Sequence, residues 1–363
     1  MSALDLFAGC GGASLGIVAA GVEVVAAYEF NERAARAHRA LLPDCPVFVE
    51  DLNDTEPASL PDADLWWASP PCQPGSSAGK RLGMQDPRNG YPALLRLADA
   101  RTPEWLIIEN VPGFAQHKRS AVCSALWPKP EKCPACYLAT VLHQLDELFA
   151  VVEMRALIAS DYGVPQHRRR LITVCGPRRI EWPERTHGPG RRHPWASAGE
   201  ALGLTTRRDM VLTVGGPAAG NGHGRYSYSL DEPSQSIRAT SDVYIERRII
   251  GAGTNPHGPD AEHERTYRDI TDEPAPCVPA SPAGNAGPFI VAADQAAPSV
   301  LDGTTRRTLT VRERAVLQAL PWHESLTGKT VGNAVPPPLA DSVVRSVITA
   351  MERRVWPLAE VTT

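Results

Sequence analysis

The chain has 363 residues, of which 43% are apolar and 21% are charged, and this is the composition of a globular protein rather than a disordered or fibrous one. A formal net charge of −4 argues against a protein that coats nucleic acid without specificity, although it allows a local basic face. Eight cysteines without regular spacing favour a reducing compartment over a disulfide framework. We find no cleavable leader and no run of transmembrane length, so we expect a cytoplasmic protein without a membrane partner.

The first predicted elements form a cradle for a nucleotide-like ligand. Residues 4–7 predict a short apolar strand, residues 8–12 a glycine-rich turn, and residues 13–20 a helix, so a ligand can approach the backbone at the helix N-terminus. A second strand ends at Glu29, where an acid can bind ribose hydroxyls. A nicotinamide dehydrogenase is the competing interpretation. The turn lacks the G-x-G-x-x-G register, however, which favours a nucleoside-carrying cofactor without a pyrophosphate.

The elements that follow alternate between helix and strand. Asn31 is predicted to cap a helix that ends near residue 41. Further strands are expected at residues 46–49, 63–68, 105–108, 151–157 and 171–175, and further helices at residues 92–101 and 138–149. This alternation predicts the α/β class, with a doubly wound and mostly parallel sheet.

The composition of the chain changes between residues 177 and 305. Proline and glycine become dense, and the expected strands are short, at residues 210–214 and 244–250. Helices return at residues 310–319, which open with a capping box of Thr310 and Glu313, and at residues 339–354. We therefore expect a large domain of residues 1–179 and 306–363, interrupted by a smaller, irregular, β-containing domain of residues 180–305.

Cys72 is predicted to lie on a stiff turn directly after a buried strand. Two prolines precede it and disfavour helix, so the cysteine leaves the sheet at the carboxyl end of the strand, where open α/β sheets place their chemistry. The loop that follows, to Arg88, combines glycine and serine with Lys80 and Arg81, which suits closure over a polyanion. A buried structural cysteine is the alternative interpretation.

Two further motifs bring polar side chains to the same edge of the sheet. Glu109 follows the strand at residues 105–108 and supplies a carboxyl group that can hold a proton against an electron-poor ring. Arg168 and Arg170 alternate along a strand that we expect to begin there, so both can bind a ring oxygen or phosphates. A thiolate, a protonated carboxyl group and a guanidinium group suit conjugate addition to a heteroaromatic ring, with alkylation at the adjacent carbon.

Arginines are concentrated around and beyond this last motif. Residues 168–192 contain eight arginines and only two acidic residues, Glu181 and Glu184. A track for phosphate groups is one interpretation of this cluster. A solvated, arginine-rich linker is the other.

Ordered motifs run through most of the chain: DLFAGCGG at residues 5–12, Glu29, Asp51, PPCQ at 70–73, ENV at 109–111, QHRRR at 166–170, LTVRE at 309–313 with Leu317 and Gln318, and GNAVPP at 332–337. In this order they resemble the DNA (cytosine-5)-methyltransferase family, prokaryotic or phage enzymes that depend on S-adenosylmethionine. The resemblance covers nearly the whole chain outside residues 180–305 and parts of 115–137. It removes the dehydrogenase interpretation.

The resemblance implies a class I methyltransferase fold, similar to the Rossmann fold, with a target-recognition domain at residues 180–305. It implies methyl transfer to carbon 5 of a cytosine that is flipped out of a specific double-stranded sequence. Cys72 would attack carbon 6, Glu109 would hydrogen-bond ring nitrogen 3 and the exocyclic amine, Arg168 would hold the base oxygen, and Arg170 would support the site.

The resemblance also implies the remaining contacts. The cofactor S-adenosylmethionine would be bound by Phe7, Ala8, Gly9, Cys10, Gly11, Gly12, Glu29, Phe30, Asp51, Leu52, Pro71, Asn333 and Val335. The loop that closes over DNA would act through Gln73, Ser76, Lys80, Arg81 and Arg88. Double-stranded DNA and a cognate restriction endonuclease are the implied partners of a nucleoid-associated monomer.

Two other functions compete with this interpretation. An RNA cytosine-5 methyltransferase would share the scaffold, but the Cys-Phe-Thr segment of the tRNA-specific relatives is absent. A non-catalytic DNA-binding regulator should have lost Cys72 or Glu109, and both residues are present.

The chain departs from the family pattern in two places. Gly75 stands where the family usually has an aromatic residue, which puts the packing of the loop in doubt. An insertion also carries half of a structural zinc motif, for which the candidate ligands are Cys123, Cys133, Cys136 and His117. Free buried cysteines are the alternative to zinc.

Overall fold

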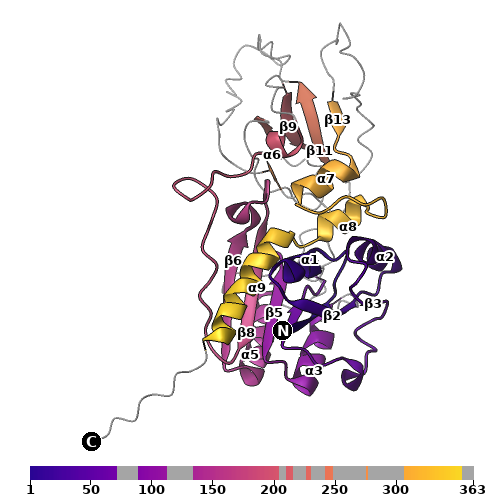
Figure 1. The fold of residues 1–363 in the computed structure, drawn as a ribbon, viewed down its shortest axis with the longest axis vertical. Helices are drawn as coiled ribbons and strands as arrows, with labels where there is room; N and C mark the ends of the chain where they lie inside the picture. The colour runs from indigo at the N-terminus through magenta and orange to yellow at the C-terminus, as the bar shows by residue number, and fades with distance from the viewer. Residues whose placement is uncertain are drawn as a thin grey trace, which may run out of the picture. The chain divides into compact units, whose positions relative to one another are not determined.

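The structure, a computed structural model, describes residues 1–71, 89–112, 134–203, 210–215, 226–229, 242–247, 275–276 and 306–353 (Figure 1). Its contacts divide the chain into two compact units. The first unit comprises Met1–Leu157, Arg170–Glu184 and Pro337–Thr363, and the second comprises Ile158–Arg169 and Arg185–Pro336. The three domain ranges expected from the sequence stay a prediction.

A seven-stranded sheet forms the centre of the first unit. Its strands lie in the order β3 (Val47–Phe48), β2 (Glu23–Tyr28), β1 (Ser2–Leu6), β4 (Leu65–Ala68), β5 (Trp105–Asn110), β8 (Arg169–Gly176) and β6 (Val151–Ile158). The pairs from β3 to β5 are parallel, and β8 runs antiparallel to β5. The sheet grows outward in both directions from β1 and β4, and such a switch point is where open α/β sheets bind their ligands.

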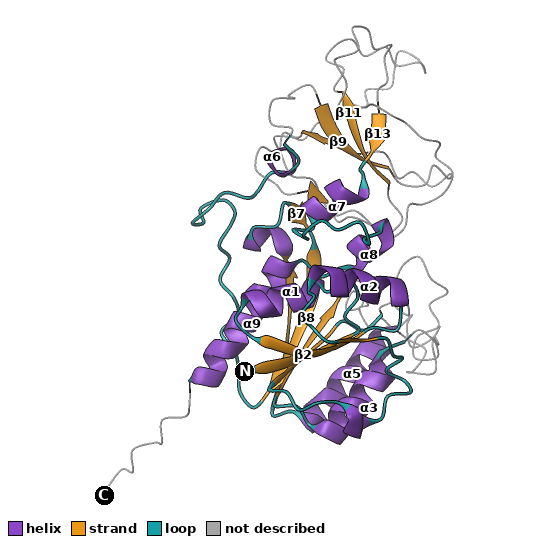
Figure 2. Cartoon of the chain, turned by 45° about the vertical axis from the view of Figure 1, so that its right-hand side comes forward, coloured by secondary structure: helices purple, strands orange, loops and turns teal. Residues whose placement is uncertain are grey.

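Helices cover both faces of this sheet. Helix α1 (Gly12–Ala19) packs along α9 (Pro337–Glu352), and α2 (Glu32–Leu41) follows β2. Helices α3 (Tyr91–Arg101) and α5 (Pro134–Leu148) lie side by side on the other face (Figure 2). The short 3-10 helix η1 (Pro57–Ser59) contacts α3.

Alternate residues of the central strands supply the core beneath each layer of helices. On one face, strand residues pack against Leu94 and Leu97 of α3 and Val141 and Leu145 of α5; these strand residues are Leu4, Leu6, Trp66, Ala68, Leu106 and Ile108. Every residue of β4 and β5 is buried, as expected for parallel strands covered on both faces.

The second unit contains a four-stranded antiparallel sheet in the order β10 (Tyr226–Ser229), β9 (Met210–Gly215), β11 (Asp242–Arg247) and β13 (Arg306–Thr308). Strand β7 (Gln166–His167) pairs in parallel with β12 (Ala275–Pro276). Its helices in the described part of the chain are η5 (Ala159–Tyr162), α6 (Ala198–Ala201), α7 (Val311–Leu317) and α8 (Gly328–Asn333).

The predicted fold class, an α/β protein with a doubly wound and mostly parallel sheet, is confirmed. The capping box at the start of α7 is also confirmed, because Thr310 Oγ1 accepts from the Glu313 amide and the Glu313 carboxylate accepts from the Thr310 amide. Among the described residues, no helix combines the length and the apolar character that a membrane span requires.

Candidate functional site

The glycine turn lies between β1 and α1, and Glu29 at the end of β2 holds it. The Glu29 carboxylate accepts from the Gly9 amide at 2.9 Å and from the Asn31 amide at 2.8 Å. Gly9 and Gly11 have φ values of +58° and +88°, which side chains rarely adopt. The sequence predicted both the glycine turn and Glu29, and in the structure the Glu29 carboxylate binds the turn through the Gly9 amide.

Phe7 begins the turn in a strained conformation. Its φ of +58° is unusual for a residue other than glycine, and such strain is found where surrounding contacts enforce it. A Cβ atom placed on Gly90 would lie 2.8 Å from both the Phe7 ring and Pro71 Cδ. Phe7, Pro71 and Gly90 therefore meet closely, which brings together two residues that the sequence placed at the cofactor.

A buried polar layer lies beneath the glycine turn. Asp5 Oδ2 accepts from the Ser14 hydroxyl at 2.6 Å, and burial raises the pKa of Asp5 to about 7. His38 on α2 is fully buried directly below Gly11, where a Cβ atom would lie 2.6 Å from the His38 ring. Burial lowers the pKa of His38 to about 4 and raises that of the Cys45 thiol to about 12. His38 and Cys45 are therefore uncharged near neutral pH, whereas Asp5 is partly ionised there.

The exposed side of the cradle fits the adenosine part of S-adenosylmethionine. Phe30 leaves 66% of its surface exposed beside Glu29 and offers a face on which a purine can stack. Each carboxylate oxygen of Glu29 has lone pairs beyond the backbone amide that it accepts, so it can also bind ribose hydroxyls. Asp51 is exposed, whereas Leu52 is buried and offers its backbone alone. The residues present are therefore compatible with the cofactor that the family uses.

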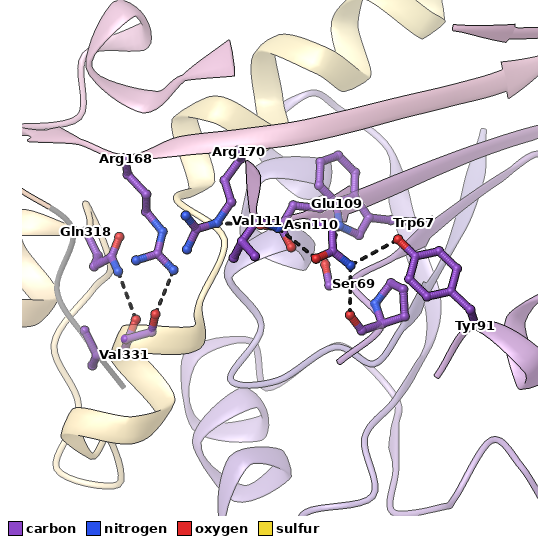
Figure 3. A network of polar contacts seen from close by, with 12 residues as sticks. Trp67, Ser69, Tyr91, Glu109, Asn110, Val111, Arg168, Arg170, Gln318 and Val331 are labelled. Carbon is purple, nitrogen blue, oxygen red and sulfur yellow. Dashed lines mark hydrogen bonds and ion pairs between the residues drawn. The ribbon is translucent and has the colours of Figure 1, made fainter. Parts of the chain in front are cut away.

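Asn110, the last residue of β5, organises the corner that precedes Cys72. Its side-chain amide donates to the Pro70 carbonyl at 3.3 Å and to the Tyr91 hydroxyl at 3.1 Å, and its carbonyl accepts from the Val111 amide at 2.8 Å (Figure 3). The sequence marked Asn110 as part of a motif and missed Tyr91. The signal for Tyr91 was its place at the start of the helix after the cysteine loop.

Glu109 forms an ion pair with Arg170. The Arg170 Nε atom lies 2.7 Å from Glu109 Oε1, and both side chains are 10% exposed (Figure 3). They lie on the neighbouring strands β5 and β8 but are diagonal to each other, because the residue directly opposite Glu109 is Ile172. The support that the sequence assigned to Arg170 therefore takes the form of a direct contact with the carboxyl group.

In the second unit, one side-chain amide and one guanidinium group bind the backbone near the GNAV motif. Arg168 donates to the Gly332 carbonyl at 2.7 Å, and Gln318 donates to the Val331 carbonyl at 3.1 Å. Arg168 is 1% exposed and lies just before β8, which begins at Arg169, so it is outside the strand along which we expected it to alternate with Arg170. Asn333 is exposed at the end of α8, and Val335 is buried.

The arginines of residues 168–192 make different contacts in the structure. Besides Arg168 and Arg170, three arginines bind within their own unit: Arg178 to the Ala350 and Arg353 carbonyls, Arg179 to Glu153, and Arg185 to Asp161. Arg191 and Arg192 are exposed in the loop of residues 186–195, in which His193 donates its amide to the Thr186 carbonyl and Gly188 donates to the His193 carbonyl. The phosphate-track and linker interpretations both stay predictions.

Asp161 of η5 anchors the loop of residues 186–195. Its backbone carbonyl accepts from the Thr186 and His187 amides, and its carboxylate accepts from Trp195 Nε1 at 3.2 Å. Burial raises the pKa of Asp161, while the hydrogen bond from Trp195 and the charges of Arg185 and Arg191 oppose this shift. Asp161 therefore holds in place the loop that carries Arg191 and Arg192.

Several predicted residues lie outside the described part of the chain. They are Cys72, Gln73, Gly75, Ser76, Lys80, Arg81, Arg88, His117, Cys123 and Cys133. Cys136 lies in α5, but its side chain is outside the described part as well. Among the described residues, no group of three or more His, Cys, Asp or Glu side chains could hold a metal ion, so zinc stays a prediction.

Comparisons with known proteins agree with this site. The family described as C-5 cytosine-specific DNA methylase matches residues 1–349. The chain is 29% identical to the Type II methyltransferase M.AplI of Arthrospira platensis over 97% of this chain and 86% of that protein. It is 27% identical to the Type II methyltransferase M.NgoMIV of Neisseria gonorrhoeae over 97% of this chain and 98% of that protein.

The fold also resembles that of a solved structure. The S. pombe Dnmt2 methyltransferase has a TM-score of 0.54 at 14% sequence identity, covering 97% of this chain and 99% of that one, and this likeness concerns the fold alone. The family match and the two relatives each extend over nearly the whole chain. The chain therefore belongs to the C-5 cytosine-specific DNA methylase family and is a DNA cytosine-5 methyltransferase.

Proposed function

We propose that this enzyme methylates carbon 5 of a cytosine flipped out of a specific double-stranded DNA sequence, through a covalent bond between Cys72 and carbon 6. Flipping is required because the ring carbons are otherwise stacked within the duplex. The observation that best supports the proposal is the corner at the carboxyl end of β5. There Asn110 holds the Pro70 carbonyl, two residues before Cys72, beside the paired Glu109.

The protein groups act on the base in sequence. The Cys72 thiolate bonds to carbon 6, while Glu109 hydrogen-bonds ring nitrogen 3 and the exocyclic amine and so stabilises the electron density that the ring takes up. Arg168 binds the base oxygen. When bound, S-adenosylmethionine supplies the methyl group that carbon 5 receives. Carbon 5 of the cytosine then loses its proton to a proton acceptor, and the bond between the Cys72 sulfur and carbon 6 breaks.

Arg170 orients the acid in this scheme. Its Nε atom engages Glu109 Oε1 at 2.7 Å. We assign Oε2 to the contact with the cytosine. The pair is largely buried, so the contact is weakly screened by solvent. Arg170 therefore acts on the reaction by holding Glu109.

The cofactor would lie over the turn from Phe7 to Gly12, beside Pro71. Glu29 would bind the ribose, and Phe30, Asp51 and Leu52 would bind the adenine. Asn333 and Val335 would hold the methionine end. The exposed Phe30 ring and the fixed Glu29 carboxylate support this assignment.

Double-stranded DNA is the proposed substrate, and a cognate restriction endonuclease is the proposed partner of a monomeric enzyme. The names of the relatives, which are Type II methyltransferases, support this part of the proposal. Target recognition is assigned to residues 180–305.

Bisulfite sequencing of plasmid DNA tests the proposal. A host without cytosine methylation would express either this chain or the Cys72→Ser variant. We expect protected cytosines in one recurrent sequence context with the unchanged chain, and none with Cys72→Ser. An absence of protection, from protein that is folded and binds S-adenosylhomocysteine, would overturn the assignment to DNA and direct the same assay to RNA.

A further inference from the structure

Arg96 reaches from the middle of α3 to the loop that contains Asp51. Its Nη2 atom donates to three backbone carbonyls, those of Leu52 at 2.9 Å, Asn53 at 3.3 Å and Thr55 at 2.9 Å. Arg96 is otherwise a surface residue, so these bonds are its main engagement with the fold. A guanidinium group donates in a fixed plane, which makes it suitable for holding several carbonyls at once.

The loop is also organised from within. Asp51 Oδ1 accepts from the Asn53 amide at 2.9 Å, and the Thr55 hydroxyl donates to Glu50 Oε1 at 2.7 Å. Leu52 and Thr55 are buried to 3% and 1% exposure, so they cannot turn freely. Arg96 adds to these local bonds a link to another element.

One peptide group connects Arg96 to Asp51. In a trans peptide the carbonyl and the amide of the same plane point in opposite directions. The Leu52 carbonyl points to Arg96, and the amide of the same peptide, that of Asn53, donates to Asp51 Oδ1. Arg96 therefore fixes the plane whose far side orients the Asp51 carboxylate.

We propose that Arg96 is a positioning residue for cofactor selectivity: it orients Asp51 so that the carboxylate accepts from the exocyclic amine of adenine. The inference rests on the proposed function, in which Asp51 lies at the adenine. Hypoxanthine has an acceptor oxygen in place of this donor amine, which would face the carboxylate unfavourably, so correct placement of Asp51 favours adenine over hypoxanthine.

The place of Arg96 on α3 also ties the cofactor loop to the catalytic corner. Tyr91, five residues earlier on the same helix, accepts a hydrogen bond from Asn110 beside Pro70. The rise of a helix separates the two positions by about 7.5 Å along its axis. One rigid helix thus sets both the corner before Cys72 and the loop after Glu50.

The test compares Arg96→Met with Arg101→Met. Methionine keeps much of the aliphatic stem and removes the guanidinium group. Arg101 lies on the same helix and pairs with the exposed Asp62, outside the cofactor loop, so it is a matched control. Binding would be measured by calorimetry with S-adenosylhomocysteine and with its deaminated analogue, which carries hypoxanthine.

We expect Arg96→Met to weaken binding of S-adenosylhomocysteine about tenfold and to reduce the preference for adenine over hypoxanthine by a similar factor. The kcat at saturating cofactor should stay close to that of the unchanged enzyme, and Arg96→Lys should bind with intermediate affinity. Arg101→Met should match the unchanged enzyme in all of these measurements.

Two results would overturn the inference. The first is an Arg96→Met variant that retains the affinity and the adenine preference. The second is an equal loss in Arg101→Met, which would indicate a general loosening of α3. Failure of the unchanged enzyme to bind S-adenosylhomocysteine would instead contradict the proposed function, so the two failures are distinguishable.

Discussion

The residues below the glycine turn show how burial sets protonation. His38 is fully buried, with a pKa lowered to about 4, whereas the pKa of Asp5 is raised to about 7. Both shifts have burial as their largest cause, and both favour the neutral form. Their effects on stability have opposite signs. His38 stabilises the fold above pH ~6.5 and loses this contribution toward its folded pKa, while Asp5 stabilises it below pH ~4 and loses its contribution as the pH rises toward neutrality.

The prediction at this scale concerns His38→Gln. Between pH 6.5 and 5 the free energy of unfolding of the unchanged protein should fall, relative to that of the variant, by about 2 kcal/mol, because folding must keep His38 neutral. Urea unfolding at a series of pH values measures this difference. The exposed His143, which pairs with Glu147 on α5, supplies the control His143→Gln, and parallel pH profiles for all three proteins would contradict the prediction.

At the scale of elements, the contact between α1 and α9 depends on Gly16. A Cβ atom there would lie 2.5 Å from both Ala340 Cβ and the Pro337 carbonyl oxygen. The buried face of α9 is formed by Leu339, Ala340, Val343, Val344, Val347 and Ala350. Glycine is unfavourable inside a helix, so its presence in α1 is explained by this close approach.

Gly16→Ala should therefore destabilise the protein, although alanine is the better helix former. Overpacking of a tight contact costs about 1–3 kcal/mol, which exceeds the gain of roughly 0.5–1 kcal/mol in helix propensity. Chemical denaturation gives the difference in the free energy of unfolding. Val18→Ala, on the exposed side of the same helix, should have little effect. A Gly16→Ala variant as stable as the unchanged protein would show that the helices can separate at no cost.

The order and type of the elements were largely predictable, and their starts were less so. Helix α9 begins at Pro337 and α5 at Pro134, two and four residues before the predicted starts. Proline lacks an amide donor that the first helical turn does not need, so a sequence that suggests a break can begin a helix. Asn31, by contrast, caps α2 as predicted, because its side chain accepts from the Ala34 amide within the same turn.

At the scale of the whole molecule, the eight arginines of residues 168–192 differ in their contacts. Some are bound to carboxylates or carbonyls of their own unit, whereas Arg191 and Arg192 are exposed on the loop of residues 186–195 that Asp161 anchors. A loop that is already held in place loses less entropy when its side chains bind phosphate groups. The prediction of a phosphate track is therefore best tested on these two residues.

The double variant Arg191→Gln, Arg192→Gln should weaken binding to all DNA sequences to a similar degree. The slope of log affinity against log salt should decrease by about 0.9 for each phosphate group that the variant no longer neutralises. Titrations of labelled duplexes at several salt concentrations measure both effects. Arg33→Gln with Arg36→Gln, on the exposed side of α2, removes the same charge and should leave the slope unchanged. Equal slopes for the two double variants would show that the loop of residues 186–195 is not part of the DNA interface.

The sequence by itself determined the fold class, the family and the motifs that carry the chemistry, because these follow from local patterns: apolar strands, a glycine turn, an acid after β2 and a cysteine after two prolines. Only the tertiary structure decided which groups meet. Glu109 with Arg170, Asn110 with Pro70, and Arg96 with the Leu52 carbonyl join residues far apart in the chain. The register of β5 with β8 and the packing of α3 bring these pairs together, and such placement depends on the whole core rather than on neighbours in sequence.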